Sequence, residues 1–220
     1  MSYSVTFLLQ IDDSMNQHTR FNRAWEQKMH SSTGTILFIF TLFLSFAVKA
    51  DGQPIKIDAK SFSCISDMTK VRGLFVANLI GNLDDTLKVA KSSNGGEYPA
   101  GSVVQLIPTE VMVKRNKGFN PATRDWEFFE LTVSKEGTKI DKRGFADVVN
   151  RFDGNCFACH IKAKPQWDLI CEKGHGCDPL PFTPDMISFI QKTDPRCEQP
   201  QALTENEMKA AAQLKKMMGG

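Results

Sequence analysis

The sequence has no excess of charge of either sign. It contains 27 Lys and Arg residues against 25 Asp and Glu residues, and the basic residues do not cluster. A nucleic-acid-binding domain needs a concentrated basic surface, so we expect no nucleic-acid partner. The sequence also shows no internal repeat and has no second Cys-x-x-Cys beside the one at 156–159. A zinc ribbon needs two such pairs, so this class of metal site is not indicated either.

Long apolar segments are scarce. The one uninterrupted apolar run covers residues 36–48 and is shorter than the ~20 residues that a membrane-spanning helix needs. It matches the apolar region of a signal peptide, and Val48-Lys49-Ala50 follows with small or compact residues at the positions that signal peptidase recognises. We predict that residues 1–50 are an N-terminal extension plus signal peptide, cleaved after Ala50, and that the protein is periplasmic or secreted. An uncleaved N-terminal anchor is the alternative.

Two start sites are compatible with this segment. Met29 lies just before the signal-like stretch, so translation starts either there or at Met1. With Met1 as the start, Arg20, Arg23 and Lys28 form a long basic region ahead of the apolar run. In either case this segment does not contribute to the fold of the mature protein.

Residues 156–160, Cys-Phe-Ala-Cys-His, have the attachment pattern of a c-type haem. In such sites the two thiols, here Cys156 and Cys159, add to the haem vinyl groups, and the histidine, here His160, is the proximal iron ligand. The alternatives are a redox dithiol, which favours a βαβ setting, and half of a zinc site. We predict one covalent haem c.

Four cysteines remain outside this motif: Cys64, Cys171, Cys177 and Cys197. An even remainder in an exported protein indicates two disulfides, with three connectivities open. The short Cys171–Cys177 loop is the favoured bridge, which leaves Cys64–Cys197 to join the two ends of the domain. A metal site of Cys171, His175 and Cys177 is the weaker alternative, because it has no fourth ligand.

The pattern of apolar and turn residues predicts an α+β fold with an antiparallel sheet flanked by helices and a disulfide-stapled helical C-terminal tail. A mixed apolar stretch at 67–79 has no assigned element. Strands are expected at 102–107, 110–115, 126–133 and 138–142, and helices at 83–91, 145–152, 183–192 and 205–218. The domain organisation that follows is a leader at 51–66, a haem domain at 67–197 and a C-terminal helix at 198–220.

The second axial position of the iron decides between electron transfer and ligand binding. The mature chain has one other histidine, His175, and three methionines in range, Met68, Met112 and Met186. His175 lies in the presumed disulfide loop, and Met112 lies in an expected strand where core packing is the commoner role. No methionine follows the motif in a loop of the kind that caps small electron carriers. The sequence therefore favours an open distal position.

Three sequence features resemble the cytochrome P-460 family and its cytochrome c′-beta relatives. They are Tyr-Pro-x-Gly-Ser-Val at 98–103, Asp-Trp-Glu at 125–127 and the late Asn-Cys-Phe-Ala-Cys-His at 155–160, within a similarity that covers roughly 67–165. The resemblance implies a mostly antiparallel sheet flanked by helices, a frequent homodimer and one pentacoordinate haem. Members of the P-460 type oxidise hydroxylamine with a haem that carries a lysine cross-link, whereas the c′-beta type lacks the link and binds NO and CO.

The resemblance also nominates residues for these roles. The family lysine would fall near Leu106, where this chain has none, so Lys114 and Lys88 are the nearest candidates for a cross-link. An oxidase needs an acid to move protons, and Glu127 or Glu130 on the aromatic strand is the candidate. Haem-facing positions are expected from the same strand: Trp126, Phe128 and Phe129.

These observations predict an exported mono-haem cytochrome with an open iron site that binds or oxidises a small nitrogen species, hydroxylamine or NO. CO is a further expected ligand, and a redox partner protein is expected as well. One alternative is a six-coordinate electron-transfer cytochrome c without catalytic activity. The other is a haem-free, disulfide-stapled binding domain in which Cys156 and Cys159 form one more bridge.

Overall fold

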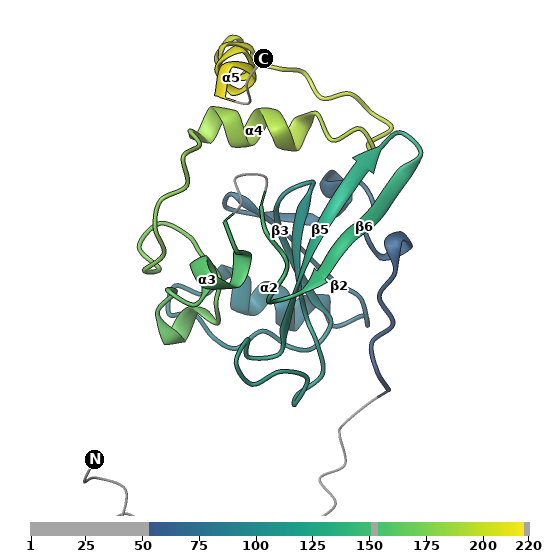
Figure 1. Cartoon of the computed structure of the whole chain (residues 1–220), viewed down its shortest axis with the longest axis vertical. Coiled ribbons are helices and arrows are strands. Elements are labelled where there is room, and N and C mark those ends of the chain that lie inside the picture. The colour runs from purple at the N-terminus through teal and green to yellow at the C-terminus, as the bar shows by residue number, and fades with distance from the viewer. Residues whose placement is uncertain (1–52, 151–153, 218–220) are drawn as a thin grey trace, which may run out of the picture. The chain divides into compact units, whose positions relative to one another are not determined.

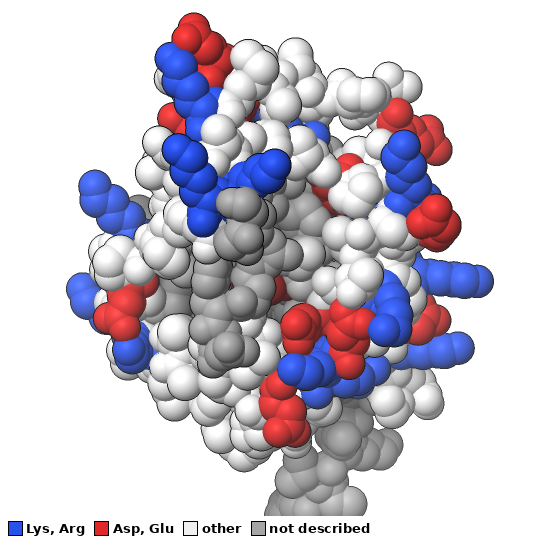
Figure 2. Space-filling view, turned by 45° about the horizontal axis from the view of Figure 1, so that its top comes forward, with Lys and Arg blue, Asp and Glu red and all other residues white. Residues whose placement is uncertain are grey.

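The computed structural model describes residues 53–150 and 154–217, which belong to one compact unit (Figure 1). The predicted signal peptide at 36–48, its cleavage after Ala50 and the two start sites, Met1 and Met29, lie outside the described residues. No helix in the described ranges is both long enough and apolar enough to cross a membrane. Figure 2 shows one face of the molecule, on which acidic and basic side chains are interspersed.

The centre of the fold is a six-stranded antiparallel sheet whose strands pair in the order in which they occur in the chain. The strands are β1 (Thr69–Val71), β2 (Leu74–Asn78), β3 (Ser102–Ile107), β4 (Glu110–Lys114), β5 (Trp126–Ser134) and β6 (Gly137–Gly144). The predicted antiparallel sheet is therefore confirmed, and four of its strands were expected close to these positions. The β1–β2 hairpin falls in the stretch 67–79, which the sequence pattern left unassigned.

The described part of the chain contains four helices outside the sheet. They are α2 (Leu83–Lys91), α3 (Cys156–His160), α4 (Pro184–Lys192) and α5 (Glu205–Met217). Three 3-10 turns accompany them: η1 (Ala59–Ser61), η2 (Ile65–Asp67) and η3 (Pro165–Trp167). The α4 and α5 pair lies beyond one end of the sheet (Figure 1).

The expected helix starts in the tail are confirmed. The Thr183 hydroxyl accepts a hydrogen bond from the backbone N–H of Met186 at the start of α4. At the start of α5, Thr204 Oγ1 accepts from the Glu207 N–H at 3.2 Å, and Glu207 Oε2 accepts from the Thr204 N–H at 2.7 Å. This reciprocal pair is the capping box that the sequence predicts.

The helix expected at 145–152 is not present in its described part. Residues 145–150 are irregular, with a single bridge between Val149 and Asn155. The side-chain amide of Asn155 donates to three carbonyls of this segment, those of Phe145, Ala146 and Val148. A side chain that occupies these carbonyls offers the backbone an alternative to helical hydrogen bonds.

The two faces of the sheet carry separate apolar clusters. On one face, Met112 of β4 and Phe128 of β5 pack with α2, α3 and the loop 163–170. On the other face, Val113 and Phe129 pack with residues 55–62. Successive residues of a strand point to opposite faces, so neighbours in β5 serve different clusters.

Residues 53–66, expected to form a leader outside the haem domain, cover this second face. Ile55, Ile57 and Phe62 are buried against the sheet, and the Phe62 and Phe129 rings lie 5.2 Å apart. The Ile57 carbonyl also accepts a hydrogen bond from Arg143 Nη1. This segment is therefore part of the folded core.

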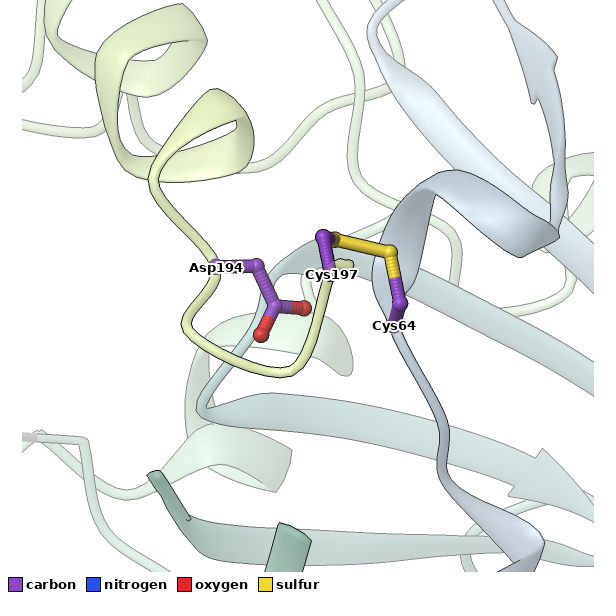
Figure 3. A group of neighbouring side chains, drawn as sticks. All are labelled: Cys64, Asp194 and Cys197. Atoms are coloured by element: carbon purple, nitrogen blue, oxygen red, sulfur yellow. A yellow bond between two sulfur atoms is a disulfide. The ribbon is translucent and has the colours of Figure 1, made fainter. Parts of the chain in front are cut away.

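Both disulfides form with the favoured connectivity. Cys64 pairs with Cys197 and Cys171 pairs with Cys177. The alternative metal site at 171–177 is wrong, because both of its sulfur ligands are in the bridge. Asp194 lies beside the Cys64–Cys197 bridge (Figure 3), where the same argument excludes a metal.

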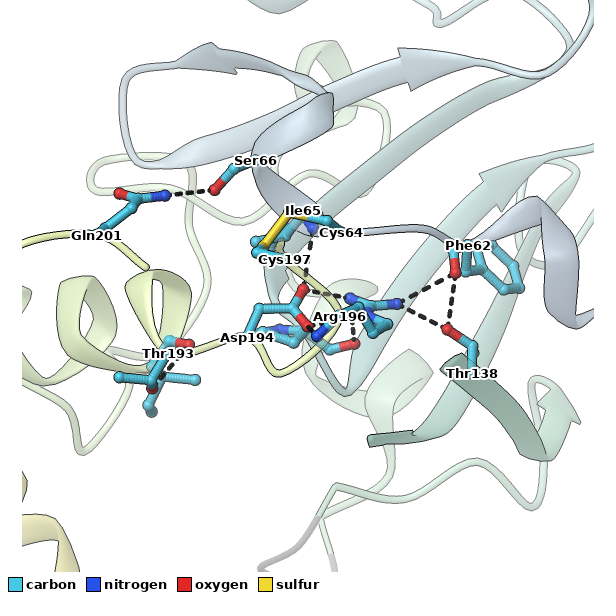
Figure 4. Close-up of a disulfide and its surroundings, with 12 residues drawn as sticks. Phe62, Cys64, Ile65, Ser66, Thr138, Thr193, Asp194, Arg196, Cys197 and Gln201 are labelled. Atoms are coloured by element: carbon cyan, nitrogen blue, oxygen red, sulfur yellow. Dashed lines mark hydrogen bonds and ion pairs between the residues drawn. A yellow bond between two sulfur atoms is a disulfide. The ribbon is translucent and has the colours of Figure 1, made fainter. Parts of the chain in front are cut away.

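A buried ion pair supports the Cys64–Cys197 bridge (Figure 4). Arg196 Nη2 lies 2.6 Å from Asp194 Oδ2, and the two side chains are 3% and 0% exposed. Asp194 also accepts from the Ile65 N–H, while Arg196 Nη1 donates to Thr138 Oγ1 of β6. Burial opposes ionisation of Asp194, but these hydrogen bonds outweigh it and lower the pKa of its carboxyl group. The C-terminal tail, the N-terminal segment and the sheet are thus joined at one point.

We expect Arg196→Met to destabilise the fold by about 3 kcal/mol, because it leaves the Asp194 carboxylate buried without its partner. The measurement is the free energy of unfolding in urea with disulfides intact. Lys139→Met is the matched control: Lys139 also pairs with an aspartate, but its side chain is 77% exposed, so the loss of stability there should be much smaller. Equal losses in both variants would contradict the assigned role of the buried pair.

Candidate haem site

The Cys-x-x-Cys-His motif forms the short helix α3, and Asn155 sets its start. The Asn155 Oδ1 accepts a hydrogen bond from the Ala158 N–H at 2.8 Å, which caps the first turn. Residues three and four positions apart lie on one face of a helix. Cys156, Cys159 and His160 therefore occupy the same side of α3.

Cys156 and Cys159 are free thiols in the structure, Cys156 half-buried and Cys159 exposed. Burial raises the pKa of the Cys156 thiol to about 12, and the nearby carboxylates of Glu110 and Glu130 add to the effect. A redox-active Cys-x-x-Cys has the opposite property, a lowered thiol pKa. The site therefore does not resemble a redox dithiol.

The motif does not form a preassembled zinc site either. Within residues 53–150 and 154–217, the one group of three potential ligands that converges is Cys64, Asp194 and Cys197, whose sulfur atoms form a disulfide. The three ligand atoms of α3 do not converge in this way. A structural zinc ion would require them to meet at one point.

The imidazole of His160 is oriented by the backbone. Its Nδ1 atom lies 2.7 Å from the carbonyl oxygen of Leu169, and a carbonyl can only accept, so Nδ1 carries the proton. Burial lowers the pKa of His160, which favours the neutral ring. The Nε2 atom consequently keeps a lone pair, the form in which histidine binds a metal.

The surroundings of His160 are apolar and aromatic. The Phe128 ring lies edge-on to the imidazole with centroids 5.3 Å apart, and Phe157 of α3 lies 6.1 Å from Phe128. Leu106 and Met112 belong to the same cluster. An apolar wall of this kind suits a large flat cofactor and controls the polarity around its iron.

Two buried polar atoms without a hydrogen-bond partner lie on the same face of the sheet as Phe128. Among the described residues, the buried side-chain atoms without a hydrogen-bond partner are Trp126 Nε1 and Glu130 Oε2. These residues stand two positions before and two positions after Phe128 in β5, so all three share one face. Buried polar groups are normally satisfied. The unpaired Trp126 Nε1 donor therefore fits a bound group with polar edges, and so does Glu130 Oε2, which has only a long ion pair with Lys142 at 3.5 Å. Free thiols, a neutral imidazole, an apolar wall and these atoms together fit a c-type haem.

Of the two glutamates nominated from the sequence, only Glu130 lies on this face. Glu127 lies on the opposite face, 4% exposed, and its carboxylate accepts hydrogen bonds from Arg115 and Arg143. Its two ion pairs measure 3.0 and 2.7 Å. Glu127 is therefore part of a structural charge cluster, and its side chain points to the sheet face opposite α3.

Glu130 stands opposite Glu110 in the β4–β5 pairing. Its Oε2 atom has Lys142 Nζ at 3.5 Å, and both glutamates contribute to the raised pKa of Cys156. The structure thus adds Glu110 to the residues around the motif. Side chains alternate between the two faces of a strand, and this alternation in the two neighbouring strands could have identified Glu110 from the sequence.

Lys114, a candidate for a haem cross-link, is buried on the motif-facing side of the sheet. Its Nζ atom lies 2.7 and 3.0 Å from the two carboxylate oxygens of Asp168 and 5.2 Å from the ring of Trp126. Burial raises the pKa of Asp168, and the ammonium of Lys114 acts against this rise. The other candidate, Lys88 on α2, lines an open cleft of about 530 Å³ that Lys114 also borders.

The four candidates for a second axial ligand lie in different parts of the fold. Met112 belongs to the cluster of Phe128 and Cys156, whereas Met68 packs on the other face and Met186 packs between α4 and α5. His175 stacks on Trp167 at 3.7 Å, and its Nδ1 atom hydrogen-bonds to the Ile170 carbonyl. Met112 is thus the one candidate of the four in the same cluster as the motif.

Comparisons of the chain with protein-family models, with curated proteins and with solved structures give no match.

We expect the unreduced protein, produced without haem-attachment machinery, to contain two alkylatable cysteines. Cys159 should react with iodoacetamide before Cys156, because Cys159 is exposed and Cys156 is half-buried. Peptide mass spectrometry after timed alkylation measures both rates. A protein with no reactive thiol would instead support the interpretation in which Cys156 and Cys159 form a third bridge.

Proposed function

We propose that this protein is an exported mono-haem c-type cytochrome in which Cys156 and Cys159 attach the haem and His160 binds its iron. The observation that carries the proposal is the contact of His160 Nδ1 with the Leu169 carbonyl at 2.7 Å. It leaves Nε2 available on the side of α3 that also carries two free thiols. Haem c attachment needs these three groups together.

We further propose that the second axial position is open and that the protein binds or oxidises a small nitrogen species, NO or hydroxylamine. The wall of Phe128 and Phe157 supports this, because aromatic side chains offer the iron no ligand. When bound, the haem would supply an iron centre for ligand binding or electron removal. The alternative, an electron-transfer cytochrome, has support from one residue, since Met112 lies in the same cluster.

For hydroxylamine oxidation the chain must also accept protons, and we assign this role to Glu130. Its Oε2 atom is buried, has no hydrogen-bond partner and lies 3.5 Å from Lys142 Nζ in a long ion pair, so it can still accept a hydrogen bond from a substrate N–H or O–H. Glu127 is bound to Arg115 and Arg143 on the other face. A proton acceptor must lie within hydrogen-bond reach of the substrate, which favours Glu130 over Glu127.

The oxidase proposal implies a redox partner protein that takes the electrons, and the family resemblance implies a homodimer. NO, CO and hydroxylamine are the small molecules to test. Export follows from the signal-like segment and agrees with the two disulfides, which form in oxidising compartments.

The visible spectrum of the protein matured with haem-attachment machinery tests the first proposal. We expect a broad high-spin spectrum in the reduced protein that shifts on addition of CO or NO. A strongly red-displaced reduced Soret band would add a lysine cross-link. Sharp low-spin bands that gas does not change would overturn the open site, and Met112→Leu would then identify the sixth ligand. No visible absorption would overturn the haem proposal itself.

We expect Glu130→Gln to slow hydroxylamine oxidation by about 10²-fold, because the amide cannot take up a proton. The matched control is Glu127→Gln in the same strand, which should leave the rate unchanged and reduce only the stability. Steady-state kinetics with an artificial electron acceptor measures both. Similar rates in the two variants would remove Glu130 from the mechanism.

A further inference from the structure

The Leu169 carbonyl, which holds His160, belongs to a strained turn. Asp168 and Leu169 are consecutive non-glycine residues with positive φ, 47° and 65°. Such conformations are unfavourable for residues with a Cβ atom and persist when surrounding contacts enforce them. The contacts that hold this turn therefore also fix the direction of its carbonyl toward the imidazole.

The buried carboxylate of Asp168 is fixed from two sides. Lys114 Nζ lies 2.7 Å from its Oδ2 atom and 3.0 Å from its Oδ1 atom, and the Tyr98 N–H donates to Oδ2 at 2.9 Å. The Lys114 and Asp168 side chains are 4% and 3% exposed. Both partners come from the sheet side, so the turn is fastened to β4 and to the segment before β3.

A continuous path therefore leads from the sheet to the proximal histidine. It runs from Lys114 through the Asp168 carboxylate and its own backbone to the Leu169 carbonyl, and from there to His160 Nδ1. Groups that hydrogen-bond the second nitrogen of a metal-bound histidine fix the ring and raise the basicity of the ligand. In the loop 165–167 before the turn, the Pro165 and Gln166 carbonyls accept hydrogen bonds from Arg124 Nη1 and the Gly96 N–H, and the Trp167 ring stacks on His175.

We propose that Lys114 and Asp168 are positioning residues for the axial histidine, and that their ion pair sets the electronic character of the haem iron through the Leu169 carbonyl. This inference rests on the proposed haem function. It gives Lys114 a different role from a cross-link, because its ammonium is already bound to a carboxylate. Neither residue would bind the iron, because the Lys114 ammonium and the Asp168 carboxylate are bound to each other.

The test is the reduction potential of the haem in the matured protein. Lys114→Met leaves Asp168 without its partner and loosens the turn, so the His160 hydrogen bond weakens, the ligand becomes less basic and the potential rises. The double variant Lys114→Gln with Asp168→Asn restores a hydrogen-bonded neutral pair and should bring the potential back toward that of the wild type. Asp168→Asn alone, which suits a positive φ, should give a smaller rise.

Arg196→Met is the matched control, because it also removes the basic partner of a buried aspartate but lies at the disulfide end of the fold. It should lower stability and leave the potential unchanged. An unchanged potential in folded Lys114→Met, or an equal shift in Arg196→Met, would overturn the positioning role. Loss of a red-displaced reduced Soret band in Lys114→Met would show that Lys114 is cross-linked to the haem. That result would also overturn the positioning role. A wild-type protein without haem absorption would refute the proposed function instead.

Where Lys114→Met does not fold, the nitrogen-labelled wild-type and Asp168→Asn proteins provide a second measurement. The exchange of the His160 Nδ1 proton with solvent reports the strength of its hydrogen bond. We expect about tenfold faster exchange in Asp168→Asn, since weaker local protection exposes the site more often. Equal exchange rates would contradict the proposal.

Discussion

The ion pair between Lys114 and Asp168 is the contact on which the organisation of the candidate site depends. Both side chains are nearly inaccessible to solvent, and a buried charge pair of this kind is tolerated only when its geometry and its additional hydrogen bonds are good. Here the Tyr98 N–H supplies the additional bond. The pair joins the central strand β4 to the loop that follows α3, so the carbonyl that contacts His160 is attached to the sheet.

Because a strand is pleated, the side chains of β5 point alternately to the two faces of the sheet. Trp126, Phe128 and Glu130 point to the face that α3 covers, while Glu127 and Phe129 point to the face that residues 55–62 cover. Phe129 packs on Phe62, and Glu127 holds two arginines. One strand thereby provides the wall of the candidate site and the anchor for the N-terminal segment.

Structural features that are determined by residues close together in the chain could be predicted from the sequence. Helix α2 and the cap of α4 are specified by residues within one or two turns, and β5 by its run of aromatic and branched residues. The short Cys171–Cys177 loop limited the disulfide choices to one favoured pairing. The same local reasoning failed at 145–150, the described part of the expected helix, because the competing hydrogen-bond donor, Asn155, lies beyond the segment that looked helical.

Features that depend on distant contacts could not be predicted. The alternation of β5 separates Glu127 from Glu130, but the sequence does not say which face meets α3. Asp168 has its partner Lys114 at a separation of 54 residues, and nothing in its neighbours indicates a buried charge. The β1–β2 hairpin was missed because its strands are short and because, in its two-residue turn Arg72-Gly73, the positive φ of 55° falls on Arg72 and not on the glycine.

The Cys64–Cys197 bridge spans 133 residues and so encloses the whole sheet, α3 and α4 in one covalent ring. A single peptide bond broken by a protease anywhere inside this ring opens the ring but leaves both pieces attached through sulfur. Such a nicked molecule keeps the mass of the intact chain apart from one added water. The exposed loops between the strands can therefore be cut once without releasing a fragment, as long as the bridge remains oxidised.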